Sequence, residues 1–320
     1  MISKDSKIYI AGHKGMVGSA CWRVLTDAGY TNLVGKTSKE LDLKDQTAVE
    51  NFINHEKPDA IIDSAAKVGG ILANNTYPYE FLMDNMLIQN NLIRSAHENN
   101  IQKFIFLGSS CIYPKHAKQP LKEEYLLTAP LEPTNEWYAI AKISGLKLIE
   151  AIRKQFGRDY VSLMPTNLYG PNDNFDLISS HVLPSMIRKF HEAKMNNNSS
   201  VILWGSGTPM REFLHVDDLA SAVVFTLENI LDEHLYNVGS GIDLSIKSLA
   251  EIVQKIVGHK GKIFWDKTKP DGTPRKLIDT NKFNNLGWKS NVELIQGVRV
   301  TYNWFKDNIE SLKELKLQNQ

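Results

Sequence analysis

The stretch that decides the fold is Ala11-Gly12-His13-Lys14-Gly15-Met16-Val17-Gly18, which directly follows the apolar run Lys7-Ile8-Tyr9-Ile10. The three glycines, in GxxGxxG rather than GxGxxG spacing, permit a tight turn, close approach of the backbone to a pyrophosphate and close packing of a helix on a strand. A helix that starts after such a turn offers free amides and a positive dipole end to an anion. The stretch therefore predicts a dinucleotide-binding βαβ unit. The alternative is a plain strand-turn-helix connection.

Around this turn, short apolar runs alternate with amphipathic stretches. The expected strands are residues 8–11, 32–34, 60–64, 103–107 and 160–164, and the expected helices are residues 17–28, 46–56, 83–99 and 138–156. Helices of this length can serve as crossovers between parallel strands. The pattern predicts an α/β protein with a Rossmann-type, doubly wound parallel sheet.

The pattern of predicted elements changes after Pro165, where loop-rich segments separate shorter helices and strands. We expect residues 1–165 to form a dinucleotide-binding domain to which segments near 211–241 return. Residues 166–320 are expected to form mainly a smaller C-terminal α/β lobe that binds the substrate.

Composition narrows the class of protein. The 320 residues are 42% hydrophobic and 23% charged with a net charge of +1, which is typical of a globular protein and argues against nucleic-acid binding. No apolar stretch approaches the roughly 20 residues of a membrane span, and the N-terminus does not resemble a signal peptide. The two cysteines, Cys21 and Cys111, are too few for a disulfide framework or a zinc site. We expect a cytoplasmic protein without a metal.

The segment after the second predicted strand bears on the choice of cofactor. NAD-binding proteins usually place a carboxylate there, but this chain has Val34-Gly35-Lys36-Thr37-Ser38-Lys39. Lys36, Ser38 and Lys39, together with Lys14 from the glycine turn, could surround a 2′-phosphate, which favours NADP(H). The alternative is that these lysines only form a solvated turn.

Two segments carry the residues of carbonyl chemistry. Leu107-Gly108-Ser109-Ser110-Cys111 ends a predicted strand, and Tyr138 and Lys142 lie four residues apart in a predicted helix, so that they share one face. A neighbouring ammonium can lower the pKa of a phenol, and a serine hydroxyl can orient the same carbonyl oxygen. This arrangement is typical of carbonyl reductases, although a Tyr-x-x-x-Lys pair alone is usually packing and surface charge.

Together, the glycine turn and this spacing resemble the extended short-chain dehydrogenase/reductase family. Within it, the chain is similar over nearly its whole length to the GDP-L-fucose synthase family. The similar segments are residues 65–71 (AAKVGGI), 109–114 (SSCIYP), 164–171 (MPTNLYGP), 204–213 (WGSGTPMREF) and 270–276 (PDGTPRK).

The resemblance implies a bifunctional enzyme. It would epimerise C3 and C5 of GDP-4-keto-6-deoxy-D-mannose and then reduce C4 with NADPH, giving GDP-L-fucose. Cys111 and His181 would be the base and acid of epimerisation. Tyr138, with Ser109, would act on the C4 oxygen, and Lys142 would also hold the nicotinamide ribose. Without the resemblance, Cys111 is more simply a buried small side chain and His181 a loop histidine.

The resemblance also implies binding residues. The expected cofactor contacts are Gly12, His13, Lys14, Gly15, Met16, Val17, Gly18, Lys36, Leu107, Gly108, Ser109, Ser110, Lys142, Pro165, Thr166, Asn167, Leu168 and His181. The expected contacts to the sugar nucleotide are Asn167, Lys189, Trp204, Arg211, Asp271 and Lys276. Two of these have a simpler alternative, since Lys189 could face solvent and Trp204 could pack within the lobe. The chain departs from the family pattern at Trp137, where a proline is expected, and at Ser38, where an arginine would hold the 2′-phosphate more firmly.

Other functions stay open. An enzyme of the same type could act on a related GDP-4-keto-deoxy sugar of the colitose or heptose type. A 4-epimerase would need no Cys and His pair, and a dehydratase would carry an Asp-Glu pair where this chain has Ser110 and Cys111. A non-catalytic NADP(H)-sensing protein is the alternative from another class. The helices at 83–99 and 138–156 form the dimer interface in the resembling family, so a homodimer is expected.

Overall fold

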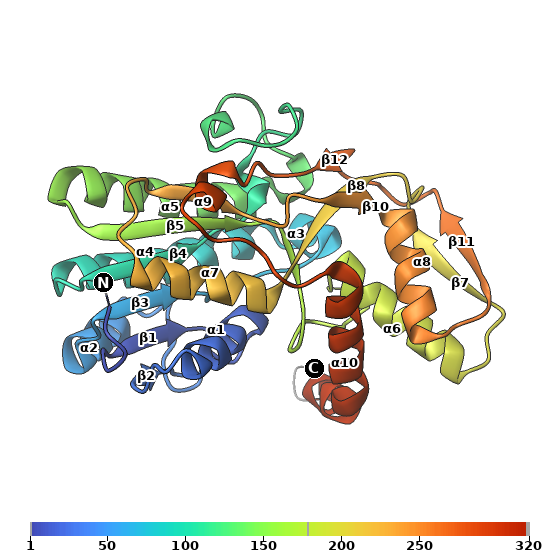
Figure 1. The fold of residues 1–320 in the computed structure, drawn as a ribbon, viewed down its shortest axis with the longest axis horizontal. Helices are drawn as coiled ribbons and strands as arrows, with labels where there is room; N and C mark the ends of the chain where they lie inside the picture. Colours follow the sequence, from blue (N-terminus) through green and yellow to red (C-terminus); the bar gives the residue numbers. More distant parts are fainter. Residues whose placement is uncertain (1, 178, 318–320) are drawn as a thin grey trace.

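A parallel sheet of six strands lies at the centre of the larger of the two lobes of the molecule (Figure 1). The computed structural model describes residues 2–177 and 179–317. The strand order is β2-β1-β3-β4-β5-β9. The strands are β1 (Ile8–Ala11), β2 (Leu33–Val34), β3 (Ala60–Asp63), β4 (Lys103–Leu107), β5 (Asp159–Pro165) and β9 (Leu235–Val238). The predicted doubly wound parallel sheet is confirmed.

Helices cover both faces of this sheet, so that every residue of β1, β3 and β4 is buried. One face carries α1 (Met16–Asp27) and α7 (Val216–Glu228), with α9 (Asn281–Asn285) at its edge. The other face carries α2 (Gln46–Glu56), α4 (Pro78–Glu98) and α5 (Glu136–Phe156). Helix α4 begins five residues before the predicted start at residue 83, because Pro78 occupies its first turn, where the fixed φ of proline suits a helix.

A second lobe, built mainly from the C-terminal half, lies beside this sheet (Figure 1). In its sheet, β8 (Met210–His215) pairs with β6 (Asn167–Tyr169), β10 (Asp243–Ser245) and β12 (Arg275–Lys276). A separate parallel pair is formed by β7 (Ser200–Trp204) and β11 (Lys262–Asp266). The helices α6 (Val182–Met195), α8 (Ile246–Val257) and α10 (Leu294–Leu317) share a third apolar core with these strands.

The chain passes between the two halves more than once. After β8 it returns to the first sheet, where α7 packs against α1 and β9 pairs with β5. The short helices α3 (Ile71–Thr76), η1 (Ser110–Ile112), η2 (Glu123–Tyr125) and η3 (Pro133–Asn135) follow strands or precede α5. Among the described helices, none is long and apolar enough to cross a membrane.

The topology predicts where a ligand can bind. Strands β1 and β3 are neighbours, while the chain runs outward from β1 to β2 and then back to β3. In doubly wound sheets, ligands bind at the carboxyl ends of the strands at this switch point. The glycine turn after β1 and the segment after β3 therefore flank the expected crevice.

Candidate active site

The glycine turn is shaped by close backbone contacts. Gly12 has a φ of +77°, and a Cβ there would lie 3.0 Å from the backbone of Ala65. A Cβ on Gly18 would overlap the carbonyl of Gly12. Helix α1 starts at Met16 without a side-chain cap, so its first amides are free to bind an anion. This cradle fits the pyrophosphate of a dinucleotide.

The imidazole of His13 lies beside the glycine turn, next to the segment that follows β2. The ring of His13 packs on Gly35, where a Cβ would lie 2.5 Å from the ring's Cγ. Burial, followed by the charge of Lys14, lowers the pKa of His13. Glu40, which the sequence interpretation did not consider, accepts hydrogen bonds of 2.7 Å from the amide and hydroxyl of Thr37. These hydrogen bonds, and to a smaller extent the charge of the nearby Lys36, lower the pKa of Glu40. Lys36 would therefore interact with both the Glu40 carboxylate and a 2′-phosphate bound here.

The Tyr138 and Lys142 side chains lie together at the carboxyl end of β4, as the four-residue spacing predicts. The Lys142 Nζ lies 6.0 Å from the centre of the Tyr138 ring and 4.7 Å from that of Phe106. It donates a hydrogen bond of 2.9 Å to the carbonyl of Leu107, the last residue of β4. The ammonium is therefore held in place by the strand that leads into Ser109.

The pKa of Tyr138 departs from the sequence-based expectation. Burial raises it, and Cys111 and Asp63 raise it further. The predicted lowering by Lys142 is wrong for the protein alone, because burial and the two acidic groups dominate. The phenol is consequently protonated at neutral pH, which suits a proton donor.

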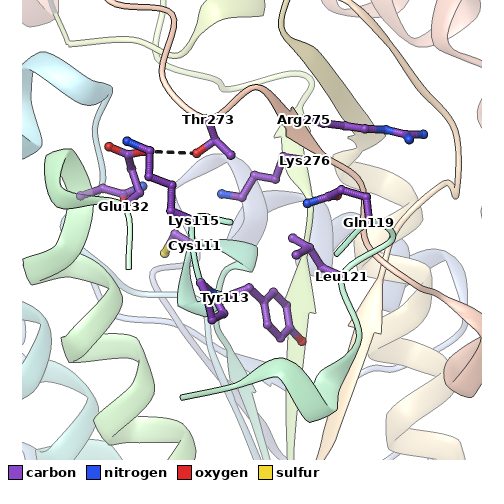
Figure 2. A pocket seen from close by; sticks show the side chains of 11 residues that line it. Cys111, Tyr113, Lys115, Gln119, Leu121, Glu132, Thr273, Arg275 and Lys276 are labelled. Atoms are coloured by element: carbon purple, nitrogen blue, oxygen red, sulfur yellow. Dashed lines mark hydrogen bonds and ion pairs between the residues drawn. The ribbon is translucent and has the colours of Figure 1, made fainter. Parts of the chain in front are cut away.

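Cys111 lies in η1, where it is 5% exposed, and its amide donates to the Ser109 Oγ at 3.3 Å. Burial raises the pKa of this thiol, and the charge of Lys276 is the largest influence that lowers it. Figure 2 shows Lys276 extending from β12 into the pocket that Cys111 lines. Lys276, which we expected only among the sugar-nucleotide contacts, thus also lies near the Cys111 thiol.

His181 precedes α6 as its N-cap residue. His181 is exposed to solvent, and its partial desolvation by neighbouring protein atoms, followed by the charge of Lys276, lowers its pKa. The segment after β3 reaches the same place, since the Gly70 amide donates to the Ser179 carbonyl at 3.0 Å. The Lys276 charge therefore acts on both Cys111 and His181, which are 70 positions apart in the sequence.

Three loops close the pocket around Cys111 (Figure 2). The Glu132 Oε2 forms an ion pair with the Lys115 Nζ at 3.0 Å and accepts a hydrogen bond of 3.4 Å from the Thr273 hydroxyl. Sequence reasoning missed these three residues because their link depends on loops that meet only in the folded chain. The signal for Lys115 was its place directly after the SSCIYP segment, whereas Glu132 has no local signal.

Five of the six residues expected to bind the sugar nucleotide, all except Asn167, fall into two groups. Lys189 and Lys269 each place an Nζ 5.4 Å from the ring centre of Trp204, which is 48% exposed. Arg211 donates to the Asp271 carbonyl at 3.3 Å, while the Asp271 carboxylate accepts from the Ser206 amide at 2.7 Å. Burial lowers the pKa of Arg211 and is also the largest cause of the lowered pKa of Lys276, which the charge of Arg211 lowers further.

The expected cofactor contacts after β5 are tied to β8. The Thr166 Oγ1 and the Asn167 Nδ2 donate to the Glu212 carbonyl at 3.3 Å and 2.7 Å. These bonds use the Thr166 hydroxyl and one N–H of the Asn167 amide, and they fix both residues at the carboxyl end of β5. Gly108 at the end of β4 packs on Met164, where a Cβ would overlap the methionine side chain.

The arrangement joins an anion cradle, a buried ammonium, a protonated phenol, a thiol and an imidazole at the carboxyl ends of the strands. A thiol and an imidazole can move protons on a carbon next to a ketone, and a phenol can donate one to the ketone's oxygen. The cationic residues nearby suit a diphosphate.

Comparisons with known proteins agree with this chemistry. Residues 8–239 match the family model of the NAD dependent epimerase/dehydratase family. The chain is 57% identical to GDP-L-fucose synthase 1 of Arabidopsis thaliana over 309 residues, covering 97% of this chain and 96% of that one.

Two solved structures share the fold. A GDP-6-OMe-4-keto-L-xylo-heptose reductase from C. jejuni has a TM-score of 0.92 at 38% identity, covering 96% of this chain and 99% of the other. A GDP-L-fucose synthetase from Naegleria fowleri bound to NADP has a TM-score of 0.89 at 27% identity, covering 97% of each chain. The chain therefore belongs to the NAD dependent epimerase/dehydratase family and, within it, to the GDP-L-fucose synthases.

Proposed function

We propose that this protein is a bifunctional 3,5-epimerase and NADPH-dependent 4-reductase that converts GDP-4-keto-6-deoxy-D-mannose to GDP-L-fucose. The observation that carries the proposal is the meeting of two sets of groups. The Tyr138 phenol and Lys142 belong to carbonyl reduction, while Cys111 and His181 belong to proton transfer. Cys111 acts electrostatically on both Tyr138 and Lys142, so the two sets share one site.

In the epimerisation half, Cys111 is the base that removes a proton from the carbon beside the ketone. Lys276 favours the thiolate that this step requires, because its charge lowers the pKa of Cys111. His181 returns a proton to the opposite face. The diphosphate of the substrate, bound beside Arg211 and Lys276, adds negative charge that favours the protonated imidazole.

In the reduction half, Tyr138 gives its proton to the C4 oxygen, and Ser109 is a second hydrogen-bond donor. The raised pKa of Tyr138 keeps this proton on the phenol before the step. NADPH, when bound, supplies the hydride. During epimerisation the same two hydroxyls stabilise the enolate oxygen.

The cofactor would lie across the switch point. The amides of the turn at residues 12–18 would hold its pyrophosphate, and Lys14 and Lys36 its 2′-phosphate. Lys142 would hold the nicotinamide ribose, while residues 107–110, residues 165–168 and His181 would surround the rest of the cofactor. We accordingly assign residues 1–165, with the returning segments near 211–241, to the NADP-binding domain.

The sugar nucleotide would lie mainly on residues 166–320. Trp204, half-exposed between two lysines, offers a face on which guanine can stack. Lys189, Arg211 and Lys276 would bind the diphosphate. Asn167 keeps its carbonyl oxygen for the ligand, and Asp271 would act by holding residues 205–208 in place.

The outer surface of α4 and α5 supports a homodimer. The two helices pack side by side, and Tyr79, Met83 and Leu87 on α4 are exposed, as are Trp137 and Ile140 on α5. A second copy packed on these residues would bury a contiguous apolar face. We also propose a cytoplasmic location, in keeping with two buried free cysteines.

The test combines the purified protein, NADPH and GDP-4-keto-6-deoxy-D-mannose, with NADPH oxidation followed by absorbance and the product identified by NMR. We expect one NADPH consumed for each GDP-L-fucose formed, and Tyr138→Phe should lose the reduction. Faster turnover of a GDP-4-keto heptose or a dideoxy sugar would assign the enzyme to that related substrate. NADPH binding without turnover of any of these sugars would favour a sensor.

A further inference from the structure

A buried carboxylate lies at the switch point without a full set of partners. Asp63, the last residue of β3, is fully buried. Its Oδ1 accepts a hydrogen bond of 3.3 Å from the Ala65 amide, while its Oδ2 has no hydrogen-bond partner among the described residues. Burying a carboxylate is costly unless a charge or hydrogen bonds compensate it. The groups around Asp63 must therefore compensate for the cost of burying its negative charge.

Strand register places Asp63 next to the catalytic lysine. Asp63 pairs with Phe106 across β3 and β4, so their side chains project from the same face of the sheet. This is the face that α5 covers, since Ile61 and Phe106 both belong to its apolar core. The Lys142 ammonium lies over the Phe106 ring at 4.7 Å. The carboxylate and the ammonium are thus neighbours.

The groups that face Asp63 come from two elements. Tyr9 of β1 and Tyr138 of α5 are phenols whose pKa values are raised mainly by burial and further by Asp63, so both are neutral near pH 7. Lys142 of α5 is the cation placed against it, and Asp63 opposes the lowering of the Lys142 pKa by burial. From the other side, Cys111 of η1 acts on Lys142 in the same direction.

We propose that Asp63 is a positioning residue for the reduction: its carboxylate keeps Lys142 in the ammonium form, held at the Leu107 carbonyl beside Tyr138. The inference rests on the proposed function, in which Lys142 holds the cofactor ribose and acts beside the proton donor. Asp63 itself touches neither cofactor nor substrate in this account.

A pH dependence follows from the burial of Asp63. Burial raises its pKa to about 6, although Lys142 opposes this. Below that pH the side chain becomes a neutral acid, which resembles asparagine in shape and charge. The wild type and Asp63→Asn should therefore behave alike at pH 5 and differ above pH 7, where only the wild type carries the negative charge that supports Lys142.

The experiment measures two ratios of wild type to Asp63→Asn between pH 5 and 8.5. One is the ratio of kcat/KM for the reduction, and the other is the ratio of NADPH affinities from fluorescence titration. We expect both ratios to be near one at pH 5 and to rise at higher pH, reaching about tenfold, the effect of one pKa unit, where Lys142 of the variant has lost its proton. Asp63→Leu, which also lacks the charge, should give the same plateau and serves if Asp63→Asn does not fold.

The matched control is Asp173→Asn. Asp173 is also buried, and burial raises its pKa to about 7, but it lies in the loop after β6 and has no electrostatic link to Lys142. This variant should change the pH dependence of thermal stability and leave both ratios flat.

Ratios for Asp63→Asn and Asp63→Leu that do not change with pH would overturn the proposal and leave Asp63 a structural residue. A wild type that turns over none of the sugars would contradict the proposed function. The affinity ratio for NADPH would still test Asp63 in that case, because it needs no sugar.

Discussion

The dinucleotide turn, residues 12–18, and the substrate cleft, formed by Cys111, Lys115, Glu132, Thr273 and Lys276, are built in different ways. The turn is one contiguous stretch whose shape depends on the absence of side chains at Gly12 and Gly18. The cleft is formed by three segments of the chain, and an ion pair between charged side chains connects two of them. Steric limits therefore govern the first region, and electrostatic balance governs the second.

The largest expected effect tests the steric region. Gly18→Val would press a branched side chain into the Gly12 carbonyl, so the turn must open. Overpacking of this kind costs about 1–3 kcal/mol of folding free energy, and we expect NADPH affinity to fall about a hundredfold. Gly15→Ala is the comparison, because a Cβ there meets only one protein atom, at 3.4 Å, and so tests contact with the cofactor without overlap inside the turn. Equal NADPH affinities of the two variants in a fluorescence titration would contradict the steric account.

A smaller effect is expected from the charge of the cleft. Lys276→Met removes the charge that lowers the pKa of Cys111, so the thiol ionises at higher pH. Hydrogen exchange at C3 of the substrate should fall about tenfold at pH 7 and recover as the pH rises, whereas Lys276→Arg should stay close to wild type. A slower exchange whose pH profile keeps the wild-type shape would show that Lys276 only binds the sugar nucleotide.

The smallest effect concerns the rim of the cleft. Glu132→Gln weakens the ion pair with Lys115 while preserving the shape of the side chain. Because a partly exposed ion pair contributes at most about 1 kcal/mol, KM should rise about threefold with kcat unchanged. Steady-state kinetics separates the two constants. A loss in kcat would instead place Glu132 in the chemistry.

The sheet that carries the first region was predicted well from the sequence, for a physical reason. The strands of the six-stranded sheet are short apolar runs, and the helices between them have strong periodicity, so local patterns determine both. The start of α4 was predicted too late, because Tyr79 and Glu80 interrupt the apolar pattern that marks the rest of the helix.

The candidate site as a whole, which includes the second region, could be predicted only in part. Cys111, Tyr138 and Lys142 lie in recognisable segments. Asp63 and Glu132 do not, since their importance depends on strand register and on loops that meet after folding. The pKa of Tyr138 was also mispredicted, because burial cannot be read from a four-residue spacing.

The most direct test of the shared site is the conversion of GDP-4-keto-6-deoxy-D-mannose with NADPH in deuterated water. NMR of the product should show GDP-L-fucose with deuterium at both C3 and C5. Cys111→Ser should still bind NADPH and should lose the exchange by roughly two to four orders of magnitude, the contribution of a general base. A reduced product without deuterium, or exchange at the wild-type rate in Cys111→Ser, would contradict a site in which Cys111 and His181 epimerise the sugar that Tyr138 helps to reduce.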